Sequence, residues 1–292
     1  MIEEPLTISK AIALSTDYLR KKGFPQARLE AELLLAKILS TNRLQLYLKF
    51  DQILNEEQKS AYREILKRRM EYEPIAYILG EREFLSRPFF VDRSVMIPRP
   101  ETELLVETAI DILRDLRQKK NETLKVFEIG VGSGIISISI ALENIDVEVV
   151  GSEISEKALT IAKKNAERHK VLNKIRFIKG NLFVDIKEKF DLIVSNPPYI
   201  SEKDRDSLSK DVLVWEPHSA LFAGEDGLFL IRKIISDSSD YLIESGFLVF
   251  EIGFGQDKEV QSLIEKTPDL KFLKIRKDLA GIPRVVIAQK IC

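Results

Sequence analysis

VFEIGVGSG, residues 126–134, is the stretch that decides the fold. Its first four residues form an apolar run that suits a buried strand, and its three glycines make a turn before a second apolar segment that favours a helix. Glycine lets the backbone come close to a ligand and adopt conformations that a side chain would forbid. The N-terminus of the following helix favours an anionic group. The stretch therefore predicts strand, turn and helix, either around a ligand or as a glycine-rich turn without one.

The alternation of strand and helix continues to the end of the chain. Apolar runs predict strands at 125–129, 147–151, 175–178, 190–194, 247–252, 272–275 and 284–288. Helices are expected after Gly134, Ser155, Asp226 and Gln256. Such alternation is typical of a doubly wound α/β domain, whose mostly parallel sheet carries helices on both faces. Ligands of these sheets bind at the carboxyl ends of the strands, where the motifs described below fall.

The N-terminal part of the chain is expected to be a helical bundle. Thr7 is suited to cap a first helix that stops near Gly23, and Pro25 suits the first turn of a second. A short third helix is predicted over 44–48. Asn55 and Gln58 form a capping signal for a fourth helix. The basic residues of this last helix, interpreted as a solvated face, are Arg63, Lys67, Arg68 and Arg69.

A change of pattern after Pro74 suggests a domain boundary. Residues 75–95 are rich in β-forming residues and predict a hairpin-like linker, and the run IPRPETE, residues 97–103, leads into a further helix. Three regions are expected: a helical bundle over 1–73, a β-hairpin linker over 74–100 and the α/β domain over 101–292.

Composition narrows the class of protein. The chain has 292 residues, of which 45% are hydrophobic and 31% charged, and its net charge is −1. A packed soluble core is expected, and a strongly basic nucleic-acid binder is disfavoured. The single cysteine, Cys292, and the two histidines are too few for an internal disulfide or a Cys- or His-rich metal site, so no metal is expected. The N-terminus does not look like a signal peptide and no membrane span is evident, so a cytoplasmic location is expected.

The spacing of the glycines separates two cofactor classes. A dinucleotide fingerprint needs G-x-G-x-x-G, whereas here the third glycine comes one residue early. The G-x-G-x-G pattern resembles motif I of class I methyltransferases, which implies S-adenosyl-L-methionine as cofactor and S-adenosyl-L-homocysteine as product. Glu153 ends the next strand, where a carboxylate is able to accept both ribose hydroxyls. The expected cofactor-binding residues are Glu128, Gly130, Val131, Gly132, Ser133, Gly134, Glu153, Asn181, Leu182 and Asn196.

NPPY, residues 196–199, follows a buried strand and predicts the catalytic loop. An amide or exocyclic amino nitrogen is a poor nucleophile because its lone pair is delocalised. Two acceptors that bind its two N–H groups turn that lone pair out of the plane, and the Asn196 side-chain oxygen and the Pro197 carbonyl are suited to this task. The prolines stiffen the loop, and Tyr199 offers an aromatic face to a planar group. Asn196, Pro197 and Tyr199 are the expected catalytic residues, and with Pro198 they form the expected substrate site. An isolated strand end followed by an ordinary turn would be the simpler interpretation of such a tetrapeptide.

These motifs resemble, nearly along the whole chain, those of the HemK/PrmC family of glutamine N5-methyltransferases. The stretches that carry the resemblance are PIAYILG (74–80), IPRPETE (97–103), EIGVGSG (128–134), NPPY (196–199) and WEP (215–217). Glu128 and Glu153 stand where aspartate is frequent in the family, Val131 replaces a usual threonine, and Asn181 replaces a usual aspartate. The NPPY loop itself is unchanged.

The resemblance implies a substrate that spacing alone does not give. The family modifies the glutamine of a Gly-Gly-Gln loop in peptide chain release factors, and its helical N-terminal domain helps to dock that protein. Three alternatives stay open: a sister branch that methylates a ribosomal protein, adenine N6 methylation of DNA or RNA by the same loop, and a non-catalytic adaptor. Neither a membrane nor stable nucleic-acid binding is expected.

Overall fold

The computed structural model of the protein describes residues 5–291, and the expectations about the chain start and Cys292 fall outside this range. The chain forms two compact units. The first comprises the chain up to Gly80 together with Lys210–Trp215, and the second comprises Glu81–Ser209 together with the chain from Glu216 onward. Each unit is described by itself.

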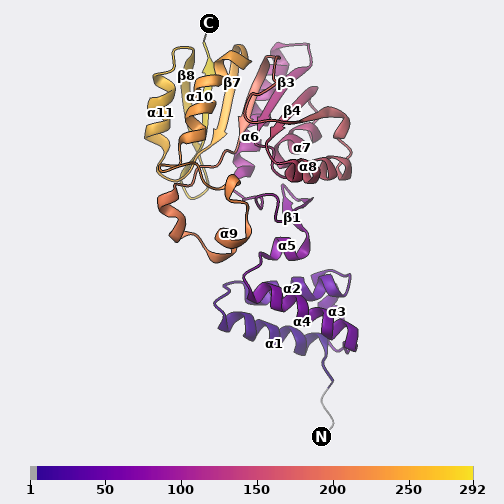
Figure 1. Cartoon of the computed structure of the whole chain (residues 1–292). Helices are drawn as coiled ribbons and strands as arrows, with labels where there is room; N and C mark the ends of the chain where they lie inside the picture. Colours follow the sequence, from indigo (N-terminus) through magenta and orange to yellow (C-terminus); the bar gives the residue numbers. More distant parts are fainter. Residues whose placement is uncertain (1–4, 292) are drawn as a thin grey trace. The chain divides into compact units, whose positions relative to one another are not determined.

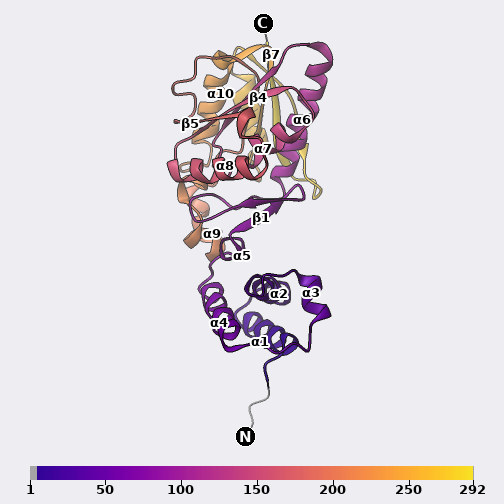
Figure 2. The ribbon, with the colours of Figure 1, turned by 90° about the vertical axis from the view of Figure 1, so that its right-hand side faces the viewer.

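The first unit is helical, as its sequence predicts. Its helices are α1 (Ile8–Lys21), α2 (Ala27–Ile38), α3 (Arg43–Leu48), α4 (Glu56–Met70), α5 (Ile75–Leu79) and, from the later insertion, α9 (Lys210–Trp215). Leu19, Leu34 and Leu35 are wholly buried in its core. The predicted caps are present: Thr7 accepts from Lys10 N at 3.3 Å, and Asn55 forms a capping box with Gln58. Figures 1 and 2 show α1, α2 and α4 packed together.

Two sequence-based expectations about this region are only partly met. The hairpin predicted within residues 75–95 is present but begins only at Glu81, because residues 75–79 form the helix α5, in which Pro74 and the left-handed Gly80 (φ 78°) bracket one turn whose Ala76 and Ile78 are buried. Burial here overrides the β propensity of the run. The basic face of α4 is not uniformly solvated. Arg69 is 5% exposed, because it pairs with Glu30 at 2.7 Å and stacks 3.9 Å above the centroid of the Phe24 ring.

The second unit begins with the antiparallel hairpin β1 (Glu81–Phe84) and β2 (Arg87–Phe90), followed by α6 (Thr102–Lys119). The strands of its main sheet are β3 (Leu124–Ile129), β4 (Val147–Glu153), β5 (Ile175–Lys179), β6 (Phe190–Ser195), β7 (Leu242–Glu251), β8 (Leu270–Lys277) and β9 (Pro283–Lys290). Its other helices are α7 (Ile135–Leu142), α8 (Glu156–Arg168), α10 (Phe229–Tyr241) and α11 (Asp257–Glu265). All seven predicted strands are therefore present.

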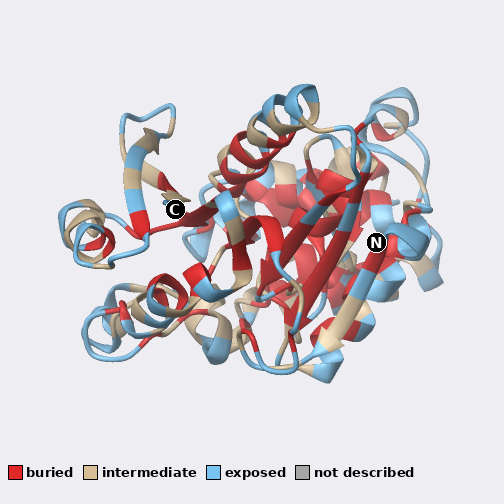
Figure 3. Ribbon diagram, turned by 90° about the horizontal axis from the view of Figure 1, so that it is seen from above, coloured by how far each residue is buried: buried red, intermediate tan, exposed pale blue. Residues whose placement is uncertain are grey.

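The main sheet is mostly parallel, with strand order β5-β4-β3-β6-β7-β9-β8, and β9 alone runs opposite to the other strands, so that its pairings with β7 and β8 are antiparallel. Alternate residues of each strand enter separate cores. Val126 of β3 packs with α6 and α7 on one face, whereas Phe127 packs with α10 and α11 on the other. Figure 3 shows buried strands between helices whose outer surfaces are exposed. The predicted fold, a doubly wound sheet with helices on both faces, is confirmed.

This strand order places β3 between β4 and β6, so the glycine turn, Glu153 and the NPPY loop all lie at the ends of adjacent strands. Because these strands are parallel, their carboxyl ends meet at one edge of the sheet. No helix within residues 5–291 is both long and apolar enough to cross a membrane.

Candidate active site

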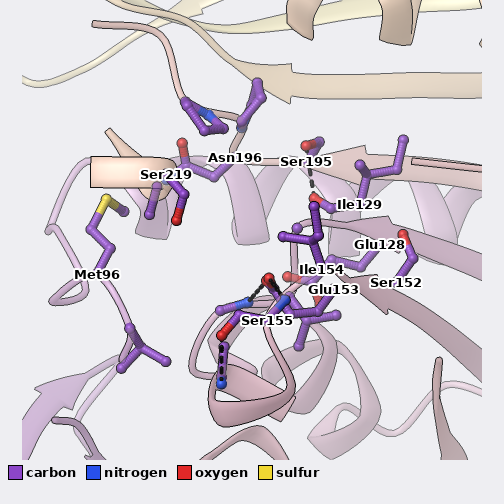
Figure 4. Close-up of a pocket in the computed structure, with 18 of the residues that line it drawn as sticks. Met96, Glu128, Ile129, Ser152, Glu153, Ile154, Ser155, Ser195, Asn196 and Ser219 are labelled. Atoms are coloured by element: carbon purple, nitrogen blue, oxygen red, sulfur yellow. Dashed lines mark hydrogen bonds between the residues drawn. The ribbon is translucent and has the colours of Figure 1, made fainter. Parts of the chain in front are cut away.

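A cavity lies at the carboxyl ends of β3, β4 and β6 and encloses about 1030 Å³ of space between protein atoms, part of it open to solvent. Figure 4 shows Glu153 and Ser155 on one side of it and Asn196 and Ser219 on another, with Met96 beside them. The cavity brings together these residues expected at the site: Glu128, Gly130, Val131, Gly132, Ser133, Glu153, Asn181, Leu182, Asn196, Pro197 and Pro198.

The glycine turn is held open by backbone conformation and by Glu153. Gly130 (φ 75°) and Gly132 (φ 56°) adopt left-handed conformations that favour glycine. Gly132 N donates to Glu153 Oε2 at 2.9 Å, and Ser155 N donates to Oε1 at 2.9 Å. The carboxylate therefore fixes the turn, and each of its oxygens, having accepted one hydrogen bond, keeps capacity to accept another.

Gly134, the third glycine, does not line the cavity. A Cβ at this position would lie 3.0 Å from the Ile138 side chain and 3.2 Å from Ala162 Cβ. This glycine therefore allows close packing of α7 against α8, and it also ends the turn in a left-handed conformation (φ 85°).

Glu128 is the buried carboxylate beneath the glycine turn. Its Oε2 accepts from Ser137 N at 2.9 Å and from the Ser137 hydroxyl, whereas its Oε1 has no hydrogen-bond partner among the described residues. Complete burial raises the Glu128 pKa to about 8, against the lowering effect of the Ser137 hydrogen bonds. The hydroxyl of Ser152, which also lines the cavity, is likewise without a partner among the described residues. These two orphaned polar atoms suit a cavity whose polar groups are completed by a ligand.

The NPPY loop begins where β6 ends. Ser195 Oγ donates to Ile129 O at 2.8 Å and so ties the end of β6 to the end of β3. Asn196 Nδ2 donates to Thr102 Oγ1 at 3.0 Å. Asn196 Oδ1 and the Pro197 carbonyl oxygen accept no hydrogen bond from residues 5–291. The loop thus presents two free acceptors beside the cavity.

Tyr199 lies outside the residues that line the cavity. Its hydroxyl donates to Glu251 Oε1 at 3.2 Å, and its backbone carbonyl accepts from Gln256 Nε2 at 3.0 Å. Burial, followed by the charge of Glu251, raises the pKa of the Tyr199 phenol, which stays protonated and able to donate. Glu251 and Gln256 belong to the stretch EIGFGQ, residues 251–256, at the end of β7.

Two of the sequence motifs meet in the wall of the site. Glu216 of the WEP stretch accepts from Arg99 at 2.5 Å and from Ile97 N at 3.1 Å, both in the IPRPETE stretch. This ion pair is buried on the Glu216 side, where the side chain is 1% exposed. It fastens the segment whose Ser94, Val95, Met96 and Pro98 line the cavity together with Pro217 and Ser219.

Sequence reasoning missed the residues that support the NPPY loop: Thr102, Gly227, Glu251, Gly253 and Gln256. A Cβ on Gly227 would lie 2.2 Å from Tyr199 O, and one on Gly253 would lie 3.0 Å from Tyr199 Cδ2. Thr102 stands inside a motif that the sequence does mark. No sequence motif points to Glu251 and Gln256, because they come close to the loop only when β7 pairs with β6 in the folded sheet.

Comparison with solved structures agrees with the fold. The catalytic domain of hMettl16, solved in complex with the MAT2A 3'UTR hairpin 6, superposes with a TM-score of 0.52 at 17% identity, covering 70% of this chain and 75% of that one. No group of three or more metal-binding side chains gathers anywhere in residues 5–291.

Comparison with protein families and curated proteins covers nearly the whole chain. The PrmC N-terminal domain matches residues 10–80, and the methyltransferase small domain matches residues 108–232. The release factor glutamine methyltransferase of Rhodopirellula baltica is 38% identical over 290 residues, which cover 99% of this chain and 98% of that protein. The enzyme of the same name from Geobacter sulfurreducens is 39% identical, covering 98% of each chain. The chain therefore belongs to the release factor glutamine methyltransferase family.

Proposed function

We propose that this chain transfers a methyl group from S-adenosyl-L-methionine to N5 of the glutamine in the Gly-Gly-Gln motif of peptide chain release factors. The observation that carries the proposal is the pair of free acceptors, Asn196 Oδ1 and Pro197 O, beside a cavity lined by the glycine turn. Family membership supports the substrate. We take S-adenosyl-L-homocysteine as the product that leaves the cavity.

The residues present fit the proposed cofactor. Gly130 and Gly132 allow a close approach to the backbone, and Glu153 keeps lone pairs for hydroxyl groups. Asn181 and Leu182 line the same cavity, and Glu128 and Ser152 offer the unpartnered oxygens. S-adenosyl-L-methionine, when bound, supplies an electrophilic methyl group on a positively charged sulfur.

The role of the loop residues follows from the chemistry of the amide. Two acceptors on the two N–H groups of the target nitrogen hold it with its lone pair turned out of the amide plane. Asn196 Oδ1 and Pro197 O supply them, and the prolines keep the loop stiff. A carbon–nitrogen bond forms as the carbon–sulfur bond breaks, and the nitrogen then releases one proton to water. We keep Tyr199 and Pro198 in the substrate site as neighbours of these acceptors.

The helical N-terminal region, residues 1–73, is proposed to dock the protein substrate. Its surface carries large apolar side chains that the core does not use. The most exposed are Leu14, Tyr18, Leu44, Leu48 and Ile53, each more than half exposed. Exposed apolar groups of this kind are common at protein interfaces.

The test is methyl transfer to a defined residue. The purified chain is incubated with methyl-labelled cofactor and, in parallel, with a release factor, the same factor with its motif glutamine replaced by alanine, ribosomal proteins, and DNA or RNA. We expect label only in the unaltered release factor, and mass spectrometry should place it on the motif glutamine. Label in ribosomal protein or nucleic acid, or release-factor binding without transfer, would overturn the proposal.

A further inference from the structure

We propose that Glu251 is a positioning residue that acts through Thr102 to fix which end of the Asn196 carboxamide faces the target nitrogen. The inference rests on the proposed function and adds to it a buried relay of hydrogen bonds behind the catalytic loop. Glu251 does not line the cavity, so it acts on the reaction only through the residues that it holds.

The direction of the relay follows from the donors available. Thr102 Oγ1 lies 2.8 Å from Glu251 Oε2 and 3.0 Å from Asn196 Nδ2. A threonine hydroxyl has a single hydrogen, and an ionised carboxylate only accepts. The hydroxyl therefore donates to Glu251 and must accept from Asn196. Because the NH₂ end of the carboxamide is used in this way, Oδ1 is the end left to accept from the substrate.

The same carboxylate also anchors the other end of the loop. Glu251 Oε1 accepts from the Tyr199 hydroxyl at 3.2 Å, so the carboxylate holds the last residue of the NPPY run directly and the first one through Thr102. Gln256 adds a backbone clamp, because its Nε2 donates to Tyr199 O at 3.0 Å while its Oε1 accepts from Gly253 N at 2.8 Å. A loop held at both ends keeps its carbonyl groups aimed without reorganisation during the reaction.

Burial brings the ionisation of Glu251 close to neutral pH. The side chain is completely buried, and this burial raises its pKa to about 7. Glu101 adds to the rise, whereas the hydrogen bonds from Thr102 and Tyr199 and the positive charge of Arg284 on β9 oppose it. A protonated Glu251 is able to donate to Thr102. The threonine hydrogen is then free to point at Asn196, which turns Oδ1 away from the substrate.

A second buried carboxylate on the same strand as the loop provides a matched control. Asp191 stands at the start of β6, is 7% exposed, and accepts from Lys120 Nζ at 2.6 Å and Lys125 N at 2.8 Å. It holds structure in a comparable way but at the opposite end of β6 from Asn196. Asp191→Asn therefore reports what the loss of a buried carboxylate does to folding alone.

The kinetic test compares isosteric variants in methyl transfer to a release factor. Glutamine at 251 is able to accept from only one of the two hydroxyls, so we expect Glu251→Gln to lower kcat about 10- to 100-fold, with KM and cofactor Kd within about twofold. Thr102→Val should lower kcat in the same way, whereas Thr102→Ser, which keeps the hydroxyl, should keep the wild-type activity. In the wild type, kcat should fall roughly tenfold per pH unit below pH 7, and this acid limb should vanish in Glu251→Gln. Unchanged kcat in Glu251→Gln, or an equal loss in Asp191→Asn, contradicts the proposal.

A second measurement tests the relay without catalysis and so separates it from the proposed function. With ¹³C-labelled glutamate and ¹⁵N-labelled asparagine, NMR follows the Glu251 carboxyl and the Asn196 side-chain NH₂, assigned from the Glu251→Gln and Asn196→Ala variants. We expect both signals to titrate with a common midpoint near pH 7, and the Asn196 response to disappear in Thr102→Val. Independent midpoints would overturn the relay even in an active enzyme. A relay intact in a chain that methylates no release factor would instead count against the proposed function.

Discussion

The glycine turn after β3 and the NPPY loop after β6 lie at the same edge of the sheet but are built in different ways. The turn is held mainly by its own backbone conformation and by Glu153, the last residue of the next strand. The loop is held by side chains from distant parts of the chain, namely Thr102, Glu251 and Gln256. Local motifs therefore suffice to build the expected cofactor side of the cavity, whereas the chemistry of the loop depends on the assembled fold.

The largest expected effect is a loss of kcat on replacing Asn196, which should affect the NPPY loop and leave the glycine turn intact. We expect Asn196→Ala to lower kcat about 10²- to 10³-fold, because one preorganised polar group is lost from the reacting nitrogen. Cofactor Kd, measured by calorimetry, should change by only about a few-fold, because Asn196 is one of many cavity residues and the glycine turn and Glu153 are untouched. Turnover within a few-fold of the wild type would remove Asn196 from the mechanism.

A smaller effect is expected from Gly227, which supports the loop from behind. An alanine Cβ there would lie 2.2 Å from Tyr199 O, so the loop must move, and we expect Gly227→Ala to lower kcat by about tenfold or more. Gly224 is the matched control, because its backbone is also left-handed (φ 81°) but its Cβ would lie at an ordinary 3.5 Å from Phe229 Cβ. Equal losses of kcat in Gly224→Ala and Gly227→Ala would show that backbone strain, and not the contact with the loop, is responsible.

At the glycine turn we expect the opposite pattern, in which cofactor Kd changes and kcat does not. Gly132→Ala places a Cβ in open space but in a left-handed conformation, which costs about 1–2 kcal/mol. To relieve this strain, the turn shifts, and the shift weakens the hydrogen bond from Gly132 N to Glu153. Because the shift absorbs part of the strain energy, we expect cofactor Kd to rise by only about five- to tenfold. The value of kcat at saturating cofactor should stay unchanged. Gly23→Ala, at a left-handed turn after α1, should lower Tm without changing Kd, and a change of Kd there would count against the argument.

The smallest expected effect concerns stability and pH at Glu128. Burial raises its folded pKa to about 8, above the ordinary value of 4.5 that holds in the unfolded chain, so its contribution to stability is fully present below pH 4.5 and is lost as pH rises through 8. Glu128→Gln removes this loss. Calorimetry should measure the difference in Tm between the variant and the wild type at pH 6 and at pH 9. We expect this difference to be larger at pH 9, in favour of the variant, by about 3 °C or more, the shift that corresponds to about 1 kcal/mol. A Tm difference that is the same at both pH values would contradict the burial argument.

The fold was predictable from the sequence because its determinants are local. Apolar runs of strand length, the caps at Thr7 and Asn55, and the glycine turn each occupy a few consecutive residues, and all of them are present. The short helix Ile75–Leu79 and the burial of Arg69 were not predicted, because the apolar face of the helix is buried by packing against α2 and α4, and Arg69 is buried by pairing with Glu30 and Phe24. The reversed direction of β9, which makes its pairings with β7 and β8 antiparallel, was likewise not predictable, because it depends on which distant strands pair.

The candidate site divides along the same line. Most residues expected around the cofactor line one cavity, because the glycine turn and Glu153 lie at the ends of neighbouring strands. The support of Asn196 by Thr102 and Glu251 could not be predicted from the sequence. Asn196 and Thr102 are 94 positions apart in the chain, and Thr102 and Glu251 are 149 positions apart. Asn196 Oδ1 is left to accept from the substrate only because Thr102 binds the Nδ2 end, and the NPPY motif alone does not predict that arrangement.

The most direct measurement of the central claim is a crystal structure of the chain with S-adenosyl-L-homocysteine and a release factor bound. We expect the side-chain nitrogen of the motif glutamine to lie about 2.7–3.2 Å from both Asn196 Oδ1 and Pro197 O. A glutamine nitrogen that contacts neither oxygen, or an Asn196 carboxamide whose NH₂ group faces it, would contradict the account.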